Sequence, residues 1–378
     1  MIIKNALVYM VNHQFKKKDI IIKNERISEL TDKADMSEVS DHVIDAGGLY
    51  AIPGLVDIHF HGAKGYDFCN ASCEEFSKIA EYEARNGILT ICPATMSYDE
   101  VTLSKIIDRT NLYKENKGAS LAGIHMEGPF INPDKACAQN PKYIMPADID
   151  MFYRLQERSN GLIKLIDIAP EIPNAIDFIE KCGKQVCVSI AHTLCNYETA
   201  KSAFEKGAKH VTHLYNAMPG INHREPGPVI AALEAGADVE LITDGMHIHP
   251  AIVRMTFQMF GADRVILISD SMEATGLSDG TYQLGGQNVT VTGRKAFLSD
   301  HPDVLAGSVS NLFYCMKNCL SMGIPFEQAI QAATENPARA IGVTRDYGRI
   351  TCGNFGNLLL VDEQLQIHSI IKKGTVLL

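Results

Sequence analysis

The sequence predicts an α/β protein, a (β/α)8 TIM-like barrel with a small β-sandwich domain formed by both chain termini. Three observations lead to this prediction. Short apolar runs recur through the middle of the 378-residue chain, with helix-like stretches between them. Both ends of the chain are rich in strand-like segments instead. Residues that can carry chemistry gather at the ends of the apolar runs. We therefore expect a small β domain over residues 1–52 and 349–378 and a catalytic barrel over residues 53–348.

The two ends of the chain have the same character. The first 50 residues contain the strand-like segments IIKNALVYM, DIIIKNERISEL and HVIDAGGLYA, separated by turns that contain Gly or Asp. The last stretch, GNLLLVDEQLQIHSIIKKGTVLL, has a similar pattern. A small sheet built from both termini and flanking a central domain is the simplest interpretation.

The middle of the chain contains eight apolar runs, each rich in Val, Ile and Leu. Continuous runs of this kind are typical of parallel strands that are buried on both faces. Strands that alternate with helices predict a parallel barrel. The runs are residues 54–62, 88–95, 121–129, 162–171, 186–193, 210–218, 239–247 and 265–273. Residues 281–298 interrupt the alternation of apolar runs and helix-like stretches, and they predict a β-hairpin inserted after the eighth strand.

The bulk composition excludes several kinds of partner. The net charge of -10 argues against nucleic acid or an anionic membrane, because both require a basic face. A small anionic substrate remains compatible, since one arginine in a cleft can hold a phosphate. No apolar run approaches the length of a membrane span, and the N-terminus lacks the pattern of a signal peptide. The 10 cysteines form no CxxC pair, which favours reduced thiols and a cytoplasmic protein.

Side chains that can bind a metal or transfer a proton lie at the C-terminal ends of the predicted strands, where barrel enzymes carry their active sites. They are His59, His61, Glu127, His192, His213, His247 and Asp270. Histidines and one glutamate suit a divalent metal. A carboxylate such as Asp270, facing water activated by that metal, is a natural proton acceptor and donor. The arrangement predicts a metal-dependent hydrolase.

The candidate residues differ in how specifically their sequence patterns indicate a metal site. His59 and His61 share a strand face and suit one metal, yet ordinary strand histidines explain the pair equally well, and His247 and His249 repeat the spacing. Glu127 can hold one metal, bridge two, or form a salt bridge at the barrel top.

Three residues outside these pairs are interpreted from their position. His125 is interpreted as either a support for a metal ligand or a core residue, and His210 as structural. Arg224 lies among Gly and Pro residues and is either a phosphate clamp or a solvated loop arginine.

Several short sequence motifs together resemble those of the N-acetylglucosamine-6-phosphate deacetylases, which belong to the amidohydrolase superfamily. They are HMEGPF, AHT, THLYNAM followed by REPG, DGMH, SDSMEATGLSDGTYQLGG and LAGS, and the likeness extends over the whole chain. The lysine that commonly bridges two metals in the superfamily is absent, because the fourth run ends in Pro170 and Glu171. Glu127 takes its place in this resemblance.

The resemblance implies a role for each matching residue. Glu127, His192 and His213 bind the common metal, and His59 and His61 match members that hold a second ion, so we expect one or two Zn²⁺ or Fe²⁺ per subunit. Asp270 is implied as the general acid and base. The implied substrate contacts are His247, Ala138, Gln139, Asn216, Ala217, Arg224, Leu305, Ala306 and Gly307. Asn216, Ala217 and Arg224 match the phosphate loop, with the arginine reaching across a homodimer interface.

Gln139 is a departure from the pattern, because some members carry a sugar-binding histidine there. A glutamine can hydrogen-bond a hydroxyl but cannot act as a cation.

The implied reaction is hydrolysis of N-acetylglucosamine 6-phosphate to glucosamine 6-phosphate and acetate, in amino-sugar catabolism and recycling. N-acetylgalactosamine 6-phosphate, or the substrate of another amidohydrolase, is an alternative. An alternative of another class is a catalytically silent binding barrel.

Overall fold

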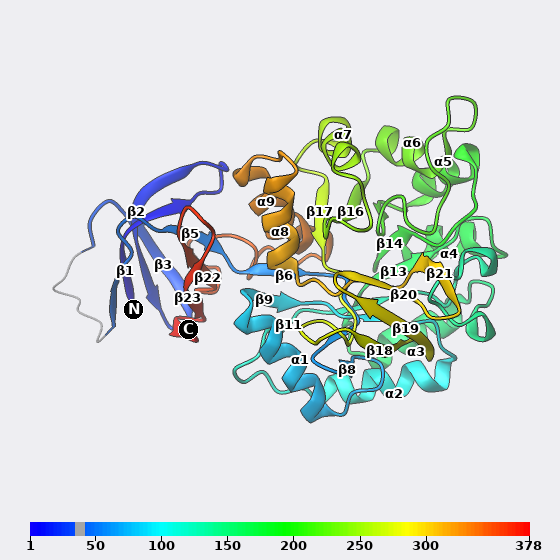
Figure 1. The fold of residues 1–378 in the computed structure, drawn as a ribbon, viewed down its shortest axis with the longest axis horizontal. Coiled ribbons are helices and arrows are strands. Elements are labelled where there is room, and N and C mark those ends of the chain that lie inside the picture. Colours follow the sequence, from blue (N-terminus) through cyan, green and yellow to red (C-terminus); the bar gives the residue numbers. More distant parts are fainter. Residues whose placement is uncertain (35–41) are drawn as a thin grey trace.

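The computed structural model describes residues 1–34 and 42–378. A small β-sheet lies beside a larger α/β body in which strands run through the centre and helices cover the outside (Figure 1). Residues 35–41, which fall inside the predicted small domain, lie outside the described part of the chain.

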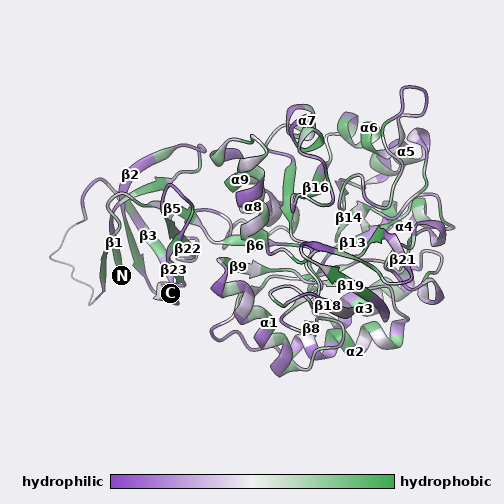
Figure 2. Cartoon of the chain, viewed as in Figure 1, coloured by the Kyte–Doolittle hydropathy of each residue, from purple (hydrophilic) through white to green (hydrophobic). Residues whose placement is uncertain are grey.

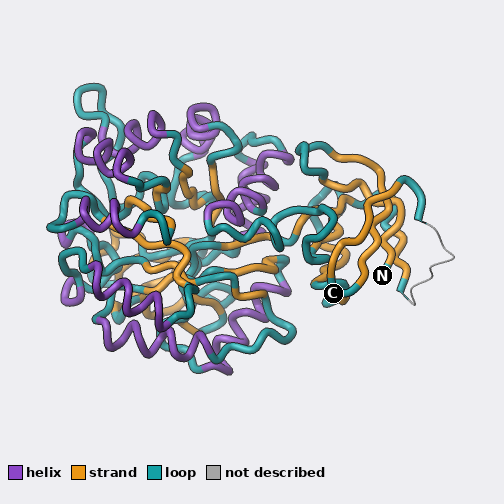
Figure 3. Tube along the Cα trace, turned by 180° about the vertical axis from the view of Figure 1, so that it is seen from behind, coloured by secondary structure: helices purple, strands orange, loops and turns teal. Residues whose placement is uncertain are grey.

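Both ends of the chain join one mixed sheet of eight strands. The sheet order is β24-β23-β22-β5-β1-β2-β3, with β4 also paired to β1, and both termini lie in this sheet in the two opposite views (Figures 1 and 3). Apolar side chains such as Ile3, Val8, Ile20 and Leu358 form its own core. The sheet strands are β1 (Ile2–Tyr9), β2 (Phe15–Lys23), β3 (Arg26–Thr31), β4 (Val43–Asp45), β5 (Tyr50–Pro53), β22 (Leu358–Val361), β23 (Ile367–Lys372) and β24 (Thr375–Val376). The sandwich form and the domain boundaries stay predictions.

Each of the eight predicted runs contains parallel strand. The strands form a seven-stranded sheet, β10-β12-β13-β14-β15-β16-β17, and a three-stranded sheet, β11-β9-β6, with every pairing parallel. Neighbours in sequence are therefore neighbours in space. The strands are β6 (Leu55–Asp57), β9 (Ile88–Ile91), β10 (Ala94–Thr95), β11 (Ser120–Leu121), β12 (Ile124–Met126), β13 (Ile163–Ile168), β14 (Cys187–Ile190), β15 (His210–Val211), β16 (Asp238–Ile242) and β17 (Val265–Ile268).

The first and last runs approach each other just beyond their strands. The backbone N–H of Asp270 donates to the carbonyl of His59 at 2.9 Å, and that of His61 donates to the carbonyl of Ser271 at 2.7 Å. These bonds bring the two ends of the parallel array together. A complete eight-stranded barrel stays a prediction.

The helices pack with one apolar side toward the strands, and many of them carry both hydrophilic and hydrophobic colours in Figure 2. In α1, a capping box between Ser72 and Glu75 satisfies the first free N–H groups. None of the helices in the described residues is long and apolar enough to cross a membrane. The helices are α1 (Cys73–Arg85), α2 (Glu100–Asn111), α3 (Ile149–Arg158), α4 (Ala175–Cys182), α5 (Tyr197–Lys206), α6 (Gly227–Ala235), α7 (Pro250–Phe260), α8 (Leu312–Ser321), α9 (Phe326–Ala333) and α10 (Glu335–Ala340).

The hairpin predicted after the eighth run is present and is larger than expected. It consists of β18 (Gly280–Leu284), β19 (Gln287–Thr292), β20 (Lys295–Leu298) and β21 (His301–Leu305), which form one antiparallel sheet. A second small ribbon, β7 (Gly62–Ala63) and β8 (Tyr66–Asp67), follows the first run. Both lie on the side of the parallel strands where the candidate residues are found.

Candidate active site

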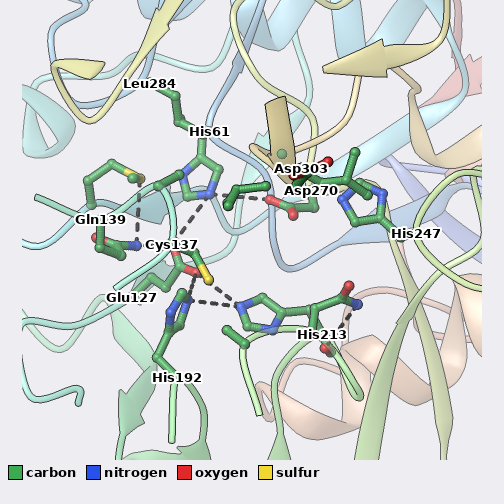
Figure 4. A pocket seen from close by; sticks show the side chains of 17 residues that line it. His61, Glu127, Cys137, Gln139, His192, His213, His247, Asp270, Leu284 and Asp303 are labelled. Carbon is green, nitrogen blue, oxygen red and sulfur yellow. Dashed lines mark hydrogen bonds and ion pairs between the residues drawn. The ribbon is translucent and has the colours of Figure 1, made fainter. Parts of the chain in front are cut away.

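A cavity of about 320 Å³ opens where the parallel strands end at their carboxyl side (Figure 4). Most of the residues singled out from the sequence line it together, although they are spread over more than 240 positions of the chain. The lining residues are His61, Met96, Glu127, Cys137, Ala138, Gln139, His192, His213, Asn216, Ala217, His247, Asp270, Leu284, Asp303, Val304, Leu305 and Gly307.

Glu127, His192 and His213 form a tight triangle of potential metal ligands. Oε1 of Glu127 lies 3.0 Å from Nε2 of His192 and 3.2 Å from Nε2 of His213, and the two nitrogens are 3.2 Å apart. Ligands at about 2.0–2.1 Å around a tetrahedral ion are separated by roughly 3.3 Å, which is close to these edges. All three side chains are buried. The donor set and its spacing fit a divalent ion.

The surroundings of this triangle fix its protonation. Nδ1 of His192 lies 2.7 Å from the carbonyl oxygen of Lys135, which can only accept, so Nδ1–H donates to that carbonyl and Nε2 is the nitrogen that faces Oε1 of Glu127. Burial opposes the charge on Glu127, but hydrogen bonds from His192 and His213 outweigh it and hold the pKa of the carboxyl well below its usual range. Glu127 is therefore an anionic ligand at neutral pH.

His59, His61 and Asp270 form a second group of ligand atoms beside the first. Oδ1 of Asp270 is 3.3 Å from Nε2 of His61 and 3.7 Å from Nε2 of His59. Nδ1 of His59 is held by Oε2 of Glu240 at 3.1 Å, while its Nε2 is fully buried without a hydrogen-bond partner. A buried nitrogen with no hydrogen-bond partner that faces a carboxylate is the environment expected for a metal ligand.

His61 is electrostatically distinct from its neighbour. Burial lowers its pKa, but the hydrogen bond with Asp270 and the charge of Glu127 outweigh burial and raise the pKa of His61 to about 9. Burial instead dominates at His59 and holds its pKa well below the ordinary value. The two histidines lie just past β6 rather than within a strand, so the strand-face argument for them was wrong in detail, although both rings still face the same centre.

Tight backbone turns aim these side chains into the cavity. His192, His213 and Asp270 have φ values of 43°, 31° and 48°, in the left-handed region that non-glycine residues rarely adopt. Gly128 follows Glu127 with a φ of 81°, and a Cβ added there would lie 2.2 Å from Oγ of Ser97. The chain thus leaves each strand sharply, directly at or after the candidate ligand.

His247 faces the cavity opposite this cluster. Its Nδ1 lies 2.8 Å from Oδ2 of Asp244, at the end of β16. Burial lowers the pKa of His247, but the bond to Asp244 and its negative charge outweigh burial and raise that pKa. With Nδ1–H held by the carboxylate, Nε2 is the nitrogen left for a ligand. His249, the other half of that HxH pair, instead caps α7 through the N–H of Ala251.

The residues expected to contact substrate fall into two groups. Ala138, Gln139, Asn216, Ala217, Leu305 and Gly307 line the cavity. Ala306 is fully buried between two of them and does not line it. Arg224 is exposed on the loop before α6 and is also absent from the lining of this single chain.

His125 and His210 lie below the cavity. Nε2 of His125 is 3.0 Å from Oδ1 of Asp167, and Nδ1 of His210 is 2.9 Å from Oγ of Ser189. Both histidines are fully buried among the strands. Their ring nitrogens face protein groups rather than the cavity.

Three carboxylates near the site were missed by sequence reasoning. Glu240 supports His59, and Asp244 supports His247. Glu171, at the end of the fourth run, accepts from Asn132 at 2.7 Å, from Thr193 at 2.5 Å and from the N–H of Leu194 at 2.6 Å. Asp244 and Glu171 each follow a strand, which was a signal, whereas Glu240 lies within β16 and its partner His59 follows a different strand.

Comparisons with known proteins agree with this geometry. The Amidohydrolase family profile matches residues 50–377. Over its whole length the chain is 32% identical to the N-acetylglucosamine-6-phosphate deacetylase of Bacillus subtilis (strain 168), of which 96% is covered. It is 30% identical to the N-acetylgalactosamine-6-phosphate deacetylase of Escherichia coli O157:H7, over 85% of this chain and 86% of that protein. Among solved structures, it matches an N-acetyl-D-glucosamine-6-phosphate deacetylase mutant from Mycobacterium smegmatis in complex with N-acetyl-D-glucosamine-6-phosphate, with a TM-score of 0.90 and 27% identity, covering 100% of this chain and 98% of that one.

Proposed function

The chain belongs to the amidohydrolase family, and we propose that it hydrolyses N-acetylglucosamine 6-phosphate to glucosamine 6-phosphate and acetate. It is a carbon–nitrogen hydrolase of amino-sugar catabolism. The observation that carries this proposal is the triangle of Glu127, His192 and His213 facing Asp270 across one cavity. Hydrolysis of an amide by this chemistry requires a set of metal ligands and a nearby carboxylate that can transfer a proton, and the cavity contains both.

A divalent ion is the cofactor that these residues would hold. Glu127, His192 and His213 provide the first position, and His59, His61 and Asp270 provide a second one beside it. His and carboxylate ligands suit Zn²⁺ and Fe²⁺. When bound, such an ion lowers the pKa of water toward neutrality and polarises a carbonyl oxygen.

Asp270 and His247 divide the proton chemistry. Asp270 accepts a proton from the attacking water as that oxygen adds to the acetyl carbon, then delivers it to the nitrogen as the C–N bond breaks. His247, oriented by Asp244, donates from Nε2 to the acetyl oxygen as negative charge develops there. The other proton of the water stays on the new carboxyl group, so acetic acid and the free amine are released, and they then ionise to acetate and ammonium.

The substrate contacts follow from the cavity lining. Ala138, Leu305 and Gly307 shape the sugar side, and Asn216 and Ala217 begin the loop that would receive the phosphate. Arg224 lies further along that loop and outside the cavity of its own chain. We therefore propose a homodimer in which Arg224 reaches the phosphate bound in the partner subunit.

The remaining architectural proposals rest on the fold. The backbone hydrogen bonds between the first and eighth runs support closure into a (β/α)8 barrel. The strands of the small sheet begin at Ile2 and end at Val376, and apart from Pro53 at the end of β5 they lie within residues 1–52 and 349–378, which we propose as its domain. All 10 cysteines are free thiols, which supports a reducing compartment such as the cytoplasm.

The decisive experiment is an assay of the purified chain on N-acetylglucosamine 6-phosphate, with metal analysis of the same sample. We expect acetate release with at least one ion per chain. Unphosphorylated N-acetylglucosamine should be turned over poorly, because it lacks the group held by the phosphate loop. Faster turnover of N-acetylgalactosamine 6-phosphate would change the assigned sugar. No turnover with less than one ion per chain would point to a silent binding protein and overturn the proposal.

A further inference from the structure

Gln139 lies in the loop after β12, and its side-chain amide has a fixed orientation. Its Oε1 lies 2.6 Å from the backbone nitrogen of Ser97, and a backbone N–H can only donate. The oxygen end of the amide must therefore face Ser97, and the NH₂ end must face the other way. Nε2 points to Oε2 of Glu127 at 2.6 Å and to the sulfur of Met96 at 3.7 Å.

The two oxygens of Glu127 serve different neighbours. Oε1 faces Nε2 of His192 and of His213 and lies 3.7 Å from Nε2 of His59, whereas Oε2 lies 3.4 Å from Nε2 of His61. The carboxylate therefore stands between the two groups of candidate ligands. A donor on Oε2 opposes rotation of the carboxylate, and Gln139 supplies that donor from a buried position (Figure 4).

We infer that Gln139 is a positioning residue that holds Glu127 so that Oε1 faces His192 and His213 while Oε2 faces His61. Both hydrogens of its NH₂ and its oxygen are already engaged, and only 1% of the residue is exposed. It therefore has no donor to offer a sugar hydroxyl, although it lines the cavity. This inference replaces the sugar contact expected from the sequence, and it rests on the metal site of the proposed function.

The test is a Co²⁺ titration of the metal-free chain, followed by visible absorption, in the wild type and in Gln139→Met. Methionine keeps the length of the side chain and removes the donor. Removing a residue that orients a metal ligand typically weakens metal binding about 10–100-fold, and we expect a loss in this range. With saturating metal, the KM for N-acetylglucosamine 6-phosphate should stay within about twofold of wild type. Unchanged Co²⁺ affinity with a raised KM would instead identify a sugar contact and overturn the inference.

Gln287→Met is the matched control. Nε2 of Gln287 donates to the carbonyl of Ala138 at 2.8 Å, so it anchors the same loop without touching Glu127. Its Co²⁺ affinity should match wild type. If it falls as far as that of Gln139→Met, loop disorder explains both results and the positioning role is wrong.

Gln139→His provides a second variant in case Gln139→Met does not fold. Its ring N–H restores a donor, and we expect Co²⁺ affinity closer to wild type than in Gln139→Met; an equal loss would contradict the inference. The titration contains no substrate. An inactive wild type would therefore overturn the proposed function, while the Co²⁺ comparison would still decide the role of Gln139.

Discussion

Asp270 is the residue that carries a proton from the attacking water to the leaving nitrogen in the proposed reaction. Replacing it with Asn keeps the shape of the side chain but removes the base, and general acid–base groups typically contribute about 10²–10⁴-fold to rate. We expect kcat to fall by at least about 100-fold in Asp270→Asn. The ion held by Glu127, His192 and His213 should remain, because none of these ligands is changed.

The measurement is steady-state kinetics together with metal content of the same preparation. Asp303, which also lines the cavity but has no place in the proposed chemistry, provides the control variant Asp303→Asn. Substantial activity in Asp270→Asn with normal metal content would show that another group moves the proton.

Glu83 makes stability depend on pH at a position away from the cavity. It is fully buried on α1, and neither carboxylate oxygen has a hydrogen-bond partner among the described residues. Burial, with a smaller effect from the charge of Asp57, raises the pKa of Glu83 well above its ordinary value of 4.5. The folded state therefore keeps a proton that the unfolded state loses. Folding stability contributed by this group declines as pH rises from 4.5 to the raised pKa.

Glu83→Gln removes this dependence, because the amide resembles the protonated acid. Thermal unfolding of metal-free protein between about pH 5 and pH 8 should show a shallower decline than wild type, the one-proton limit being about 1.4 kcal/mol per pH unit. Glu74→Gln, exposed on the same helix, should follow wild type. Parallel pH profiles for wild type and Glu83→Gln would show that Glu83 is ionised in the folded protein.

The site residues that could be predicted from the sequence are those whose position at the end of an apolar run indicates their role. Those that could not be predicted depend on contacts that the sequence does not reveal. His192 and Asp270 could be predicted because each ends an apolar run, and strand ends meet at one edge of a parallel array. The role of Glu240 could not, since its contact with His59 joins positions 181 apart in sequence. The hydrogen bond that orients the amide of Gln139 could not be predicted either, because the backbone N–H of Ser97 that makes it is invisible in the sequence.

At the scale of elements, Glu171 joins the loops that follow three neighbouring strands. Its carboxylate accepts from Asn132 after β12 and from Thr193 and Leu194 after β14. Thr193 directly follows the candidate ligand His192. We expect Glu171→Ala to let this loop shift and to weaken binding of the first ion by about tenfold, as other supporting residues of metal ligands do.

Competition with a chelator measures this affinity. Glu180→Ala is the control, because Glu180 is an exposed residue of α4 that pairs with Lys206 at the surface. Equal metal affinity in Glu171→Ala and wild type would show that His192 is held without this carboxylate.

Element prediction succeeded where burial made the pattern strong and fell short where it did not. The runs that became β13 and β17 are almost entirely buried, so their apolar residues marked them clearly. The fourth strand of the inserted sheet, β21, is mostly exposed and reads as HPDVL, with no apolar alternation to predict it. The hairpin was therefore expected, but its extension to four strands was not.

At the scale of the whole molecule, the parallel order of the strands could be predicted from the regular alternation of apolar runs and helix-like stretches. The association of two chains into a dimer produces no such repeating pattern in the sequence. The position of Arg224 is the structural argument for a dimer. It is exposed and outside the cavity of its own chain, while Asn216 and Ala217 of the same loop line that cavity. If the loop serves two sites, Asp270 and Arg224 of one working site come from different subunits.

Complementation between two inactive variants tests this arrangement. Asp270→Asn and Arg224→Ala chains are co-expressed with different affinity tags, and the mixed dimer is purified through both tags. One of its two symmetric sites then combines an intact Asp270 with Arg224 of the partner subunit, so the mixed dimer should recover about half of wild-type activity at low substrate. If Arg224 acted within its own chain, neither site would be complete and the mixed dimer would be no better than its parents. Failure to recover any doubly tagged protein would show that the chain does not dimerise, and the shared site would then be wrong.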